Sequence, residues 1–372
     1  MGDILMSSPA IRAVKQTLGC KITVLTSSMG NAIVPFIPEI DQVIVCDLPW
    51  MKHTNEFTPG DYENLIEKLK AGKYDGAIIF TVYSQSPLPS AMMAYLAGIP
   101  RRLAYSRENP YQLLTDWVAE KEPYTFVRHQ VRRDLDLVAQ IQSLLSDEHL
   151  SLETNKACWP ELKVKLHEMN IPKDRLWIIM HAGVTEAKRR YPIRGWIETG
   201  KLLLNAFPCR LLFTGSLIEA TTSEKICQEI GGESVSLSGK LSLQEFITLV
   251  KHSQLVISVN TSTVHIAAAS GVPIVVLYAL TNPQHTPWKS KGEVLPFHVP
   301  EKLRSKNEVI KYVNDHLFIG NLPIPDPQDI CRAAHRILIQ GERKQIPEII
   351  LSTRAEVKKI GKFAWLPADR NL

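Results

Sequence analysis

The sequence predicts an α/β protein in which parallel sheets are covered by helices. Short apolar segments of strand character alternate with amphipathic segments of helical spacing along nearly the whole chain. The length of 372 residues exceeds one ordinary core, so two domains are expected. We place the boundary in the polar, irregular stretch at residues 146–160. The expected domains are residues 1–155 and 156–345, each Rossmann-like, followed by a helical tail at residues 346–372.

In the first half, three strands and three helices are predicted after the N-terminal segment. Strands are predicted at Lys21–Thr26, Gln42–Cys46 and Gly76–Thr81, and helices at Tyr62–Ala71, Pro89–Leu96 and Val127–Leu145. The segment Gly2–Gln16 has the pattern of a turn that leads into a helix, but no strand comes before it. Two explanations are open: the sheet lacks a strand, or the chain is truncated at its N-terminus, which we favour.

The second half alternates more regularly. Strands are predicted at Leu176–Met180, Arg210–Thr214, Ser234–Leu237, Leu255–Val259 and Pro273–Leu277. Helices are predicted at Glu161–Met169, Arg194–Asn205, Thr222–Glu229, Leu243–His252, Val264–Ser270, Pro325–Gly341 and Pro347–Ile360. This alternation is typical of a doubly wound sheet, which binds ligands at the carboxyl ends of its strands.

Composition narrows the function classes. No apolar run is long enough to cross a bilayer, and the first residues lack the pattern of a signal peptide, so a cytoplasmic location is expected. The net charge of +5 comes without a basic stripe interleaved with aromatic residues, which argues against nucleic-acid binding. That charge suits an anionic ligand or a peripheral contact with an acidic membrane surface. The six cysteines form no CxxC pair and no zinc spacing, so buried, reduced thiols are expected.

The strongest local signal is the segment Asn260-Thr261-Ser262-Thr263-Val264-His265. An apolar strand ends there in small polar residues and turns directly into a helix rich in alanine. Free N–H groups and the positive end of the helix dipole would face the carboxyl edge of the sheet, where they can hold an anion. An ordinary helix N-cap is the alternative interpretation.

Two further loops follow predicted strands of the same sheet. The first contains Thr185 and the cations Lys188, Arg189 and Arg190, which can meet a diphosphate; a solvated charge run is the alternative. In the second, Gly215 permits close backbone approach and Glu219 can accept from ribose hydroxyls; a plain turn is the alternative.

Because all three loops leave one sheet edge, their joint occurrence favours a site for a phosphorylated small molecule. Motifs of several other enzyme classes are missing from the sequence. It contains no P-loop, no dinucleotide-binding glycine motif after a strand, no nucleophile elbow and no carboxylate group with metal-site spacing.

Five segments in order resemble glycosyltransferase family 9, the lipopolysaccharide heptosyltransferases. They are Gly2-Asp3-Ile-Leu with Pro9-Ala-Ile-Arg-Ala-Val-Lys15, Lys188-Arg-Arg-Tyr-Pro192, Ser238-Gly-Lys-Leu-Ser-Leu-Gln-Glu245, Asn260 to His265 with the alanines that follow, and Thr281-Asn-Pro283. The resemblance extends from Gly2 to about Trp288. It implies the GT-B fold, in which two Rossmann-like domains have parallel sheets that face across a cleft.

The resemblance also implies an activity. An inverting transfer, without a metal or other cofactor, would move a heptose or related sugar from an ADP-sugar donor to a lipid A–core acceptor. Asp3 falls on the proposed general base, and the phosphate-binding cation falls on Lys188 or Arg189. Glu219 falls on the ribose side and Leu241 beside the adenine.

The expected binding residues follow from the loops and the resemblance together. For the donor they are Thr185, Lys188, Arg189, Gly215, Glu219, Leu241, Asn260, Thr261, Ser262, Thr263, Val264 and His265. For an anionic acceptor, the basic residues of the N-terminal domain are candidates: Arg101, Arg102 and Arg107, with Arg132 and Arg133 beside them. A solvated basic surface is the alternative for each arginine.

Departures from the family pattern define the alternatives. Asn260 stands where the family often has an acid, and Ser262 stands where it usually has glycine, which bears on recognition of the donor-sugar hydroxyls. The absent first strand leaves Asp3 without its expected scaffold. The alternative functions are therefore another GT-B sugar-nucleotide enzyme, such as an epimerase, and a binding relative without catalysis in which Asp3 has no place in the cleft.

Overall fold

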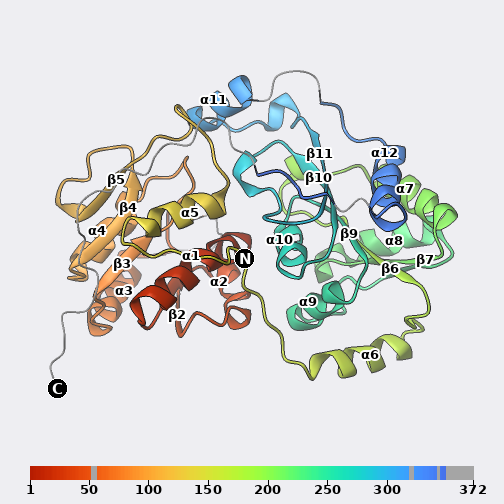
Figure 1. Ribbon diagram of the computed structural model, residues 1–372, viewed down its shortest axis with the longest axis horizontal. Coiled ribbons are helices and arrows are strands. Elements are labelled where there is room, and N and C mark those ends of the chain that lie inside the picture. The colour runs from red at the N-terminus through yellow and green to blue at the C-terminus, as the bar shows by residue number, and fades with distance from the viewer. Residues whose placement is uncertain (52–56, 318–321, 342–343, 349–372) are drawn as a thin grey trace. The chain divides into compact units, whose positions relative to one another are not determined.

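The computed structural model describes residues 1–51, 57–317, 322–341 and 344–348. The chain divides into two compact units, of which unit 1 spans Asp3–Glu148 and unit 2 begins at His149. Both units are α/β, with every named strand pair parallel (Figure 1). In the described part of the chain, no helix is long and apolar enough to cross a membrane.

Unit 1 contains two small sheets. Its strands are β1 (Thr23–Thr26), β2 (Gln42–Val45), β3 (Gly76–Ile79), β4 (Arg101–Ser106) and β5 (Asp116–Ala119). Its helices are α1 (Gly2–Leu18), α2 (Ser28–Asn31), α3 (Pro59–Ala71), α4 (Leu88–Leu96) and α5 (Gln130–Ala139). The strands pair as β1-β2 and, separately, as β3-β4-β5. Buried residues of α3 and α4 form one apolar cluster with Leu25 and Ile44 of the first sheet and Ala77 of the second, so the same helices cover both sheets.

Helix α1 contains a proline and remains helical around it. Pro9 has no N–H to donate to the carbonyl of Leu5, four residues earlier. The Ser8 hydroxyl donates to that carbonyl oxygen instead, at 2.7 Å. The helix begins at Gly2, so Asp3 lies in the first turn, where a negative charge interacts favourably with the helix dipole. The segment predicted as a turn before a helix is therefore helical from its first residue, Gly2.

Unit 2 contains one continuous sheet of six strands. The strands are β6 (Leu176–His181), β7 (Cys209–Phe213), β8 (Ser234–Ser236), β9 (Leu255–Val259), β10 (Ile274–Ala279) and β11 (Gly292–Phe297). The helices are α6 (Cys158–Glu168), α7 (Ile193–Ala206), α8 (Ala220–Ile230), α9 (Leu243–Lys251), α10 (Ser262–Ala269), α11 (Glu308–Leu317) and α12 (Pro327–Leu338). The strand order is β11-β10-β9-β6-β7-β8, which is the doubly wound arrangement that the sequence predicts.

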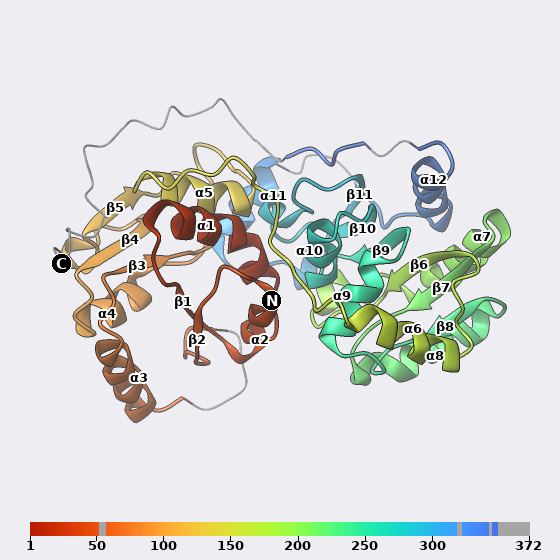
Figure 2. The same cartoon turned by 60° about the horizontal axis from the view of Figure 1, so that its bottom comes forward.

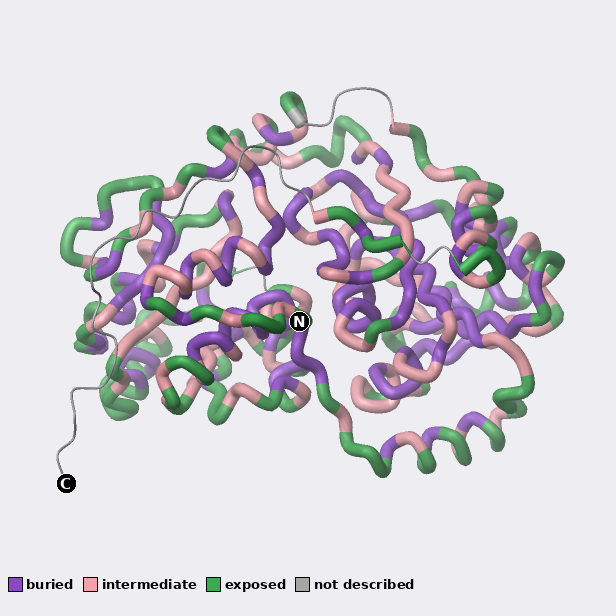
Figure 3. Tube along the Cα trace, viewed as in Figure 1, coloured by how far each residue is buried: buried purple, intermediate pink, exposed green. Residues whose placement is uncertain are grey.

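The inner strands of unit 2 are buried on both faces. Every residue of β7, β9 and β10 is buried, as expected for parallel strands with helices on both sides. Helices α7 and α12 pack together, as do α6 and α9, and both pairs lie side by side in the two views of Figures 1 and 2. The purple strands in Figure 3 contrast with the green outer turns of α6.

The structure extends the sequence analysis in several places. The eight predicted strands are present within about two residues at each end. Strands β4, β5 and β11 and helices α2 and α11 were not predicted. The helix predicted at Val127–Leu145 is shorter, since α5 covers only Gln130–Ala139. The helix predicted at Pro347–Ile360 lies, beyond its first two residues, outside the described residues, and the absence of a first strand stays a prediction.

Candidate functional site at the carboxyl edge of unit 2

The order in which the chain adds strands to the unit 2 sheet reverses between β6 and β9, although the two strands are parallel. From β6 the chain passes to β7 and β8 on one side, and then returns to β9 on the other side of β6. The loops after β6 and β9 therefore separate at the carboxyl edge. This is the position at which doubly wound sheets bind their ligands. Two of the three loops that the sequence singled out, at residues 185–189 and 260–265, lie at this point.

The loop after β6 brings two cations to this edge. Lys188 and Arg189 lie on a short 3₁₀ helix, η3 (Ala187–Arg189), and their side chains are 28% and 29% exposed. Both share one carboxylate, because Lys188 Nζ and Arg189 Nε each lie 3.3 Å from Glu186 Oε2. Arg189 Nη1 also donates to the Asn260 carbonyl oxygen at 3.1 Å, which joins the two loops at the switch point. Two positive charges against one negative charge leave this edge attractive to an anion.

Helix α10 begins beside these cations with an uncapped first turn. Its N-cap residue is Thr261, whose side chain makes no capping hydrogen bond. The Thr261 Oγ1 atom is buried and has no hydrogen-bond partner in the described structure. Ser262, the first helical residue, is half-buried. An uncapped helix start next to Arg189 combines free N–H donors with positive charge, which is the chemistry of a phosphate site.

Asn260 has a different role from the capping role considered for it. The side-chain Nδ2 donates to the Ala279 carbonyl at 3.2 Å, and the Ala279 N–H donates back to Oδ1 at 3.2 Å. Nδ2 also lies 3.3 Å from Thr281 Oγ1. Asn260 thus links the end of β9 to the end of β10 and does not cap α10. An aspartate could not donate to the Ala279 carbonyl, so the amide suits this position.

The later residues of this segment are interior residues. Thr263, Val264 and His265 are 2%, 0% and 5% exposed. The Val264 side chain therefore packs in the interior, and a donor contact by its side chain is not supported. Only Thr261 and Ser262 remain accessible in the segment, and both retain polar groups at the helix start.

Glu219 lies between the loops that follow β6 and β7. Its Oε2 accepts from the Ser216 N–H at 2.6 Å and from the Ser216 hydroxyl at 2.8 Å, which closes a capping box on η4 (Leu217–Glu219). A Cβ on Gly183 would stand 2.1 Å from Glu219 Oε1, and a Cβ on Gly215 would stand 2.8 Å from Oε2. The two glycines therefore make room for this carboxylate. No hydrogen bond to Oε1 occurs within the described residues, so one oxygen is available to a ligand.

His181 was not identified by the sequence analysis. It is the last residue of β6, and its Nδ1 lies 3.1 Å from the Thr214 hydroxyl oxygen at the end of β7. Burial lowers the pKa of His181 to about 4, although the nearby Glu219 charge acts in the opposite direction. The imidazole is therefore neutral near pH 7. In the sequence, the position of this histidine at the end of a predicted buried strand could have identified it as a residue of the carboxyl edge.

The remaining predicted donor residues lie on the same side of the sheet. Gly215 follows β7, and its carbonyl accepts from the Gly239 N–H at 2.9 Å in the loop after β8. Leu241 is half-buried two residues after Gly239, and Thr185 is exposed in the loop after β6. The structure therefore brings the predicted donor loops to one edge, with contacts between neighbouring loops.

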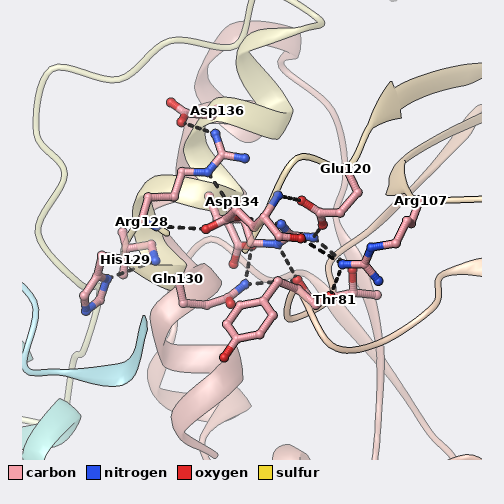
Figure 4. Close-up of polar contacts among 12 residues, drawn as sticks. Thr81, Arg107, Glu120, Arg128, His129, Gln130, Asp134 and Asp136 are labelled. Carbon is pink, nitrogen blue, oxygen red and sulfur yellow. Dashed lines mark hydrogen bonds and ion pairs between the residues drawn. The ribbon is translucent and has the colours of Figure 1, made fainter. Parts of the chain in front are cut away.

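The carboxyl edge of β3, β4 and β5 in unit 1 has a different character, shown in Figure 4. Arg133 is 1% exposed and donates to the Thr81 carbonyl at 2.7 Å. Its two terminal nitrogens lie 2.7 Å from Glu122 Oε2 and 2.5 Å from Glu120 Oε2. Arg128 adds a pair with Asp136 at 2.6 Å. We call Arg128, Arg133, Glu120, Glu122 and Asp136 the buried ion network.

The structure shows which partners the arginines proposed for acceptor binding have, and Arg133 alone of them belongs to this network. The guanidinium of Arg133 is paired with buried carboxylates, and Arg132 pairs with Glu148 at 2.7 Å. Arg102 is 7% exposed and donates to the backbone carbonyls of Gln112 and Leu113 at 2.9 and 2.8 Å, so its role is structural. Arg101 begins β4 and therefore lies at the amino end of that strand, away from the edge at which ligands bind.

Arg107 and Asp3 remain candidates of unit 1. Arg107 follows the carboxyl end of β4, is exposed, and donates to the carbonyls of Tyr83 and Glu122 at 2.8 Å. Asp3 is exposed in the first turn of α1. No cluster of three or more histidine, cysteine, aspartate or glutamate side chains that could hold a metal ion occurs among the residues that the structure describes.

Comparisons with known proteins agree with this geometry. The sequence pattern of glycosyltransferase family 9 (heptosyltransferase) matches residues 62–310, which is more than half of the chain. The chain is 24% identical over 296 residues to lipooligosaccharide heptosyltransferase 2 of Haemophilus influenzae, covering 77% of this chain and 83% of that protein.

Solved structures show the same fold. The glycosyltransferase family 9 protein of Veillonella parvula has a TM-score of 0.71 at 16% identity, covering 91% of this chain and 94% of that one. The E. coli ADP-heptose LPS heptosyltransferase II has a TM-score of 0.67 at 20% identity, covering 92% and 96%. The predicted GT-B fold is confirmed, and the chain belongs to glycosyltransferase family 9, the heptosyltransferases.

Proposed function

We propose that this protein transfers a heptose or a related sugar, with inversion, from an ADP-sugar donor to a lipopolysaccharide core acceptor. The observation that carries the proposal is the uncapped start of α10 beside Arg189 at the switch point of unit 2. Family membership and the relatives named as heptosyltransferases support the sugar class.

Donor binding in this proposal uses the edge of unit 2. The diphosphate meets Lys188, Arg189 and the N–H groups at the start of α10, with the Thr261 hydroxyl as a further donor. These groups stabilise the negative charge that grows on the leaving diphosphate as the sugar departs. Transfer is therefore expected to persist when divalent cations are removed with EDTA.

The ribose side of the donor fits the loops after β6 and β7. Glu219 is oriented by its bonds to Ser216 and keeps Oε1 for a ribose hydroxyl. The neutral His181 adds no positive charge beside this carboxylate, so Glu219 remains a free acceptor. Leu241, on the loop after β8, supplies apolar surface for the adenine.

Asp3 is the proposed general base. Its carboxylate takes the proton of an acceptor hydroxyl, the hydroxyl oxygen forms a bond to the anomeric carbon, and the bond from that carbon to the diphosphate breaks, releasing ADP. Attack from the face opposite the leaving group gives inversion. The first turn of α1 exposes the carboxylate for this role.

The test is a transfer assay with ADP-heptose and a deep-core acceptor. Asp3→Asn keeps the size of the side chain but removes the base, so kcat is expected to fall by about 10²–10⁴-fold. Calorimetry should show ADP binding unchanged in this variant. Unchanged turnover would remove Asp3 from the mechanism, and failure of the wild-type protein to bind ADP would reject the donor site.

The acceptor and the location are parts of the same proposal. A lipid-linked acceptor implies work in the cytoplasm at the inner membrane, with peripheral contact. The net charge of +5 suits a surface of anionic lipids. Of the predicted acceptor residues, Arg107 is the one whose exposure and position at the carboxyl end of β4 support contact with an anionic acceptor.

A further inference from the structure

Helix α1 carries the proposed base, and its two halves are fixed by different polar contacts. In the C-terminal half, Arg12 donates to the Asp147 carbonyl at 2.7 Å, and Lys15 lies 2.5 Å from Asp41. In the N-terminal half, the buried hydroxyl of Ser7 donates to Asp134 of α5 at 2.7 Å. Ser7 follows Asp3 by one helical turn, so this bond restrains the part of the helix on which Asp3 lies.

Asp134 is itself held in place by its own element. It is 1% exposed, and its Oδ1 accepts from Gln130 Nε2 at 2.8 Å. Gln130 Nε2 also lies 3.4 Å from the Thr81 carbonyl oxygen, just beyond the end of β3. Figure 4 shows Gln130, Asp134 and Thr81 together. A chain of hydrogen bonds therefore runs from the carboxyl edge of the sheet through α5 to α1.

The electrostatics agree with this proximity. Burial raises the pKa of Asp134 to about 7, the hydrogen bond from Ser7 is the largest influence that lowers it, and the charge of Asp3 raises it further. Asp3 is thus close enough for its charge to act on Asp134. The Ser7 hydroxyl is also one of the two neutral donors that satisfy the buried carboxyl.

We propose that Ser7 and Asp134 are positioning residues: their hydrogen bond fixes the first turns of α1 and thereby holds Asp3 in the geometry that proton removal requires. This inference rests on the proposed function for its catalytic part. Its structural part, the restraint of the N-terminal half of α1, stands independently.

The experiment compares four variants of the full chain. Ser7→Ala removes one donor, and Asp134→Leu removes the acceptor. Asp134→Asn is the conservative replacement, because its amide oxygen can still accept from Ser7. When the Gln130 amide flips, the new amide nitrogen can donate to Gln130 Oε1, which is buried without a partner in the described structure. Ser143→Ala is the control, since Ser143 is a 1% exposed serine of unit 1 whose Oγ has no partner among the described residues.

The expected kinetic result is a selective loss of turnover. Ser7→Ala and Asp134→Leu should lower kcat by about 10- to 100-fold, because a displacement on the order of 1 Å at a reacting group has effects of that size. The KM for the donor and the affinity for ADP should stay unchanged. Asp134→Asn and Ser143→Ala should retain most of the wild-type kcat. A kcat of Ser7→Ala within about twofold of wild type, or no rescue by Asp134→Asn, would overturn the proposal.

Hydrogen–deuterium exchange separates this proposal from the proposed function. The amides of residues 2–10 should exchange faster in Ser7→Ala than in wild type or in Ser143→Ala, while unit 2 is unchanged. If the wild-type protein transfers no sugar, the proposed function fails, and the exchange result still decides the restraint. Identical exchange in Ser7→Ala and wild type overturns the restraint, whatever the activity, and this single-atom deletion gives the answer even if Asp134→Leu does not fold.

Discussion

The two carboxyl edges of this protein are both rich in polar groups, but they use those groups differently. At the edge of unit 2, the Thr261 hydroxyl has no partner in the described structure and α10 begins without a side-chain cap. At the edge of unit 1, Arg133 is surrounded by Glu120, Glu122 and the Thr81 carbonyl, and it is 1% exposed.

The two edges therefore differ in which groups are left unpaired: at unit 2 it is the helix start beside two cations, whereas the Arg133 guanidinium of unit 1 is paired with two carboxylates and a carbonyl. A buried donor without a partner costs free energy, and that cost is removed when a ligand supplies the acceptor. A network whose members satisfy one another has nothing left for a ligand. The comparison favours a donor site in unit 2 and a structural role for the buried ion network of unit 1, and five predictions test it.

The largest effect is expected from Arg133→Leu. It leaves the Glu120 carboxylate, which is 4% exposed, without its guanidinium partner, while the Glu122 carboxylate, which is 0% exposed, keeps Arg128. The free energy of unfolding should fall by about 3–5 kcal/mol, measured by urea denaturation. Arg132→Leu is the matched control: its pair with Glu148 is 31% and 17% exposed and should cost about 1 kcal/mol or less. Equal losses would contradict the structural role of the network.

Asp134→Asn should change how the stability of unit 1 depends on pH. Burial raises the pKa of Asp134 in the folded protein to about 7, from 3.8 for an unperturbed aspartate. The folded state therefore binds the proton more tightly, and wild-type stability should fall as pH rises from about 4 to about 7. The full change amounts to about 4 kcal/mol. Denaturation at pH 5 and pH 8 should show a smaller fall in the asparagine variant; the same fall in both proteins would refute the assignment.

His181→Asn should reveal the opposite dependence in unit 2. Burial lowers the pKa of His181 to about 4 from 6.5, so the unfolded state binds the proton more tightly. Wild-type stability should therefore rise between about pH 4 and pH 6.5 and be complete above that range, a change of about 3 kcal/mol. Asparagine can still bond to Thr214 but does not titrate. A rise of the same size in the variant, by denaturation at pH 4.5 and 7, would rule out His181 as its source.

Loss of the two cations should weaken nucleotide binding at the unit 2 edge. In Lys188→Ala with Arg189→Ala, the diphosphate loses charge-assisted hydrogen bonds worth about 2–3 kcal/mol together, because both side chains are partly exposed. The Kd for ADP should therefore rise by about 30- to 150-fold, measured by calorimetry. Arg190→Ala removes one charge from the same loop at an exposed position and should leave the Kd within about twofold. An equal loss of ADP affinity in Arg190→Ala would show that Lys188 and Arg189 act only through general positive charge.

The smallest effect is expected from Gly183→Ala. The added Cβ would stand 2.1 Å from Glu219 Oε1, so the carboxylate must move. The expected cost is about 1–2 kcal/mol in stability, with weaker ADP binding. A double-mutant cycle supplies the control: in a Glu219→Ala background the same substitution should cost much less, because the colliding group is absent. Additive losses would show that Glu219 does not occupy the space between the loops.

Sequence reasoning identified the donor loops because their signal is local. A buried strand followed by small polar or cationic residues identifies a carboxyl edge, and strand alternation places such edges together. It failed where the fate of a side chain depends on distant partners. In the sequence, Arg102 and Arg133 look like Arg107, as basic residues of the N-terminal domain. In the structure, Arg102 and Arg133 are held by protein partners at Gln112, Leu113, Glu120 and Glu122. The strand β4 was missed because it begins with two arginines and not with an apolar run.

By itself, the sequence determined the fold class and, apart from β11, the succession of strands and loops along unit 2. Apolar periodicity and turn residues act over a few neighbouring positions, so they can be read directly. Only the tertiary structure decided which side chains can reach a ligand and which are held by the protein itself. Asn260 is hydrogen-bonded to the end of β10, Val264 is interior, and Ser7 donates to Asp134, 127 positions further along the sequence. The physical reason is that burial and hydrogen-bond satisfaction are set by segments far apart in the chain, which no local pattern records.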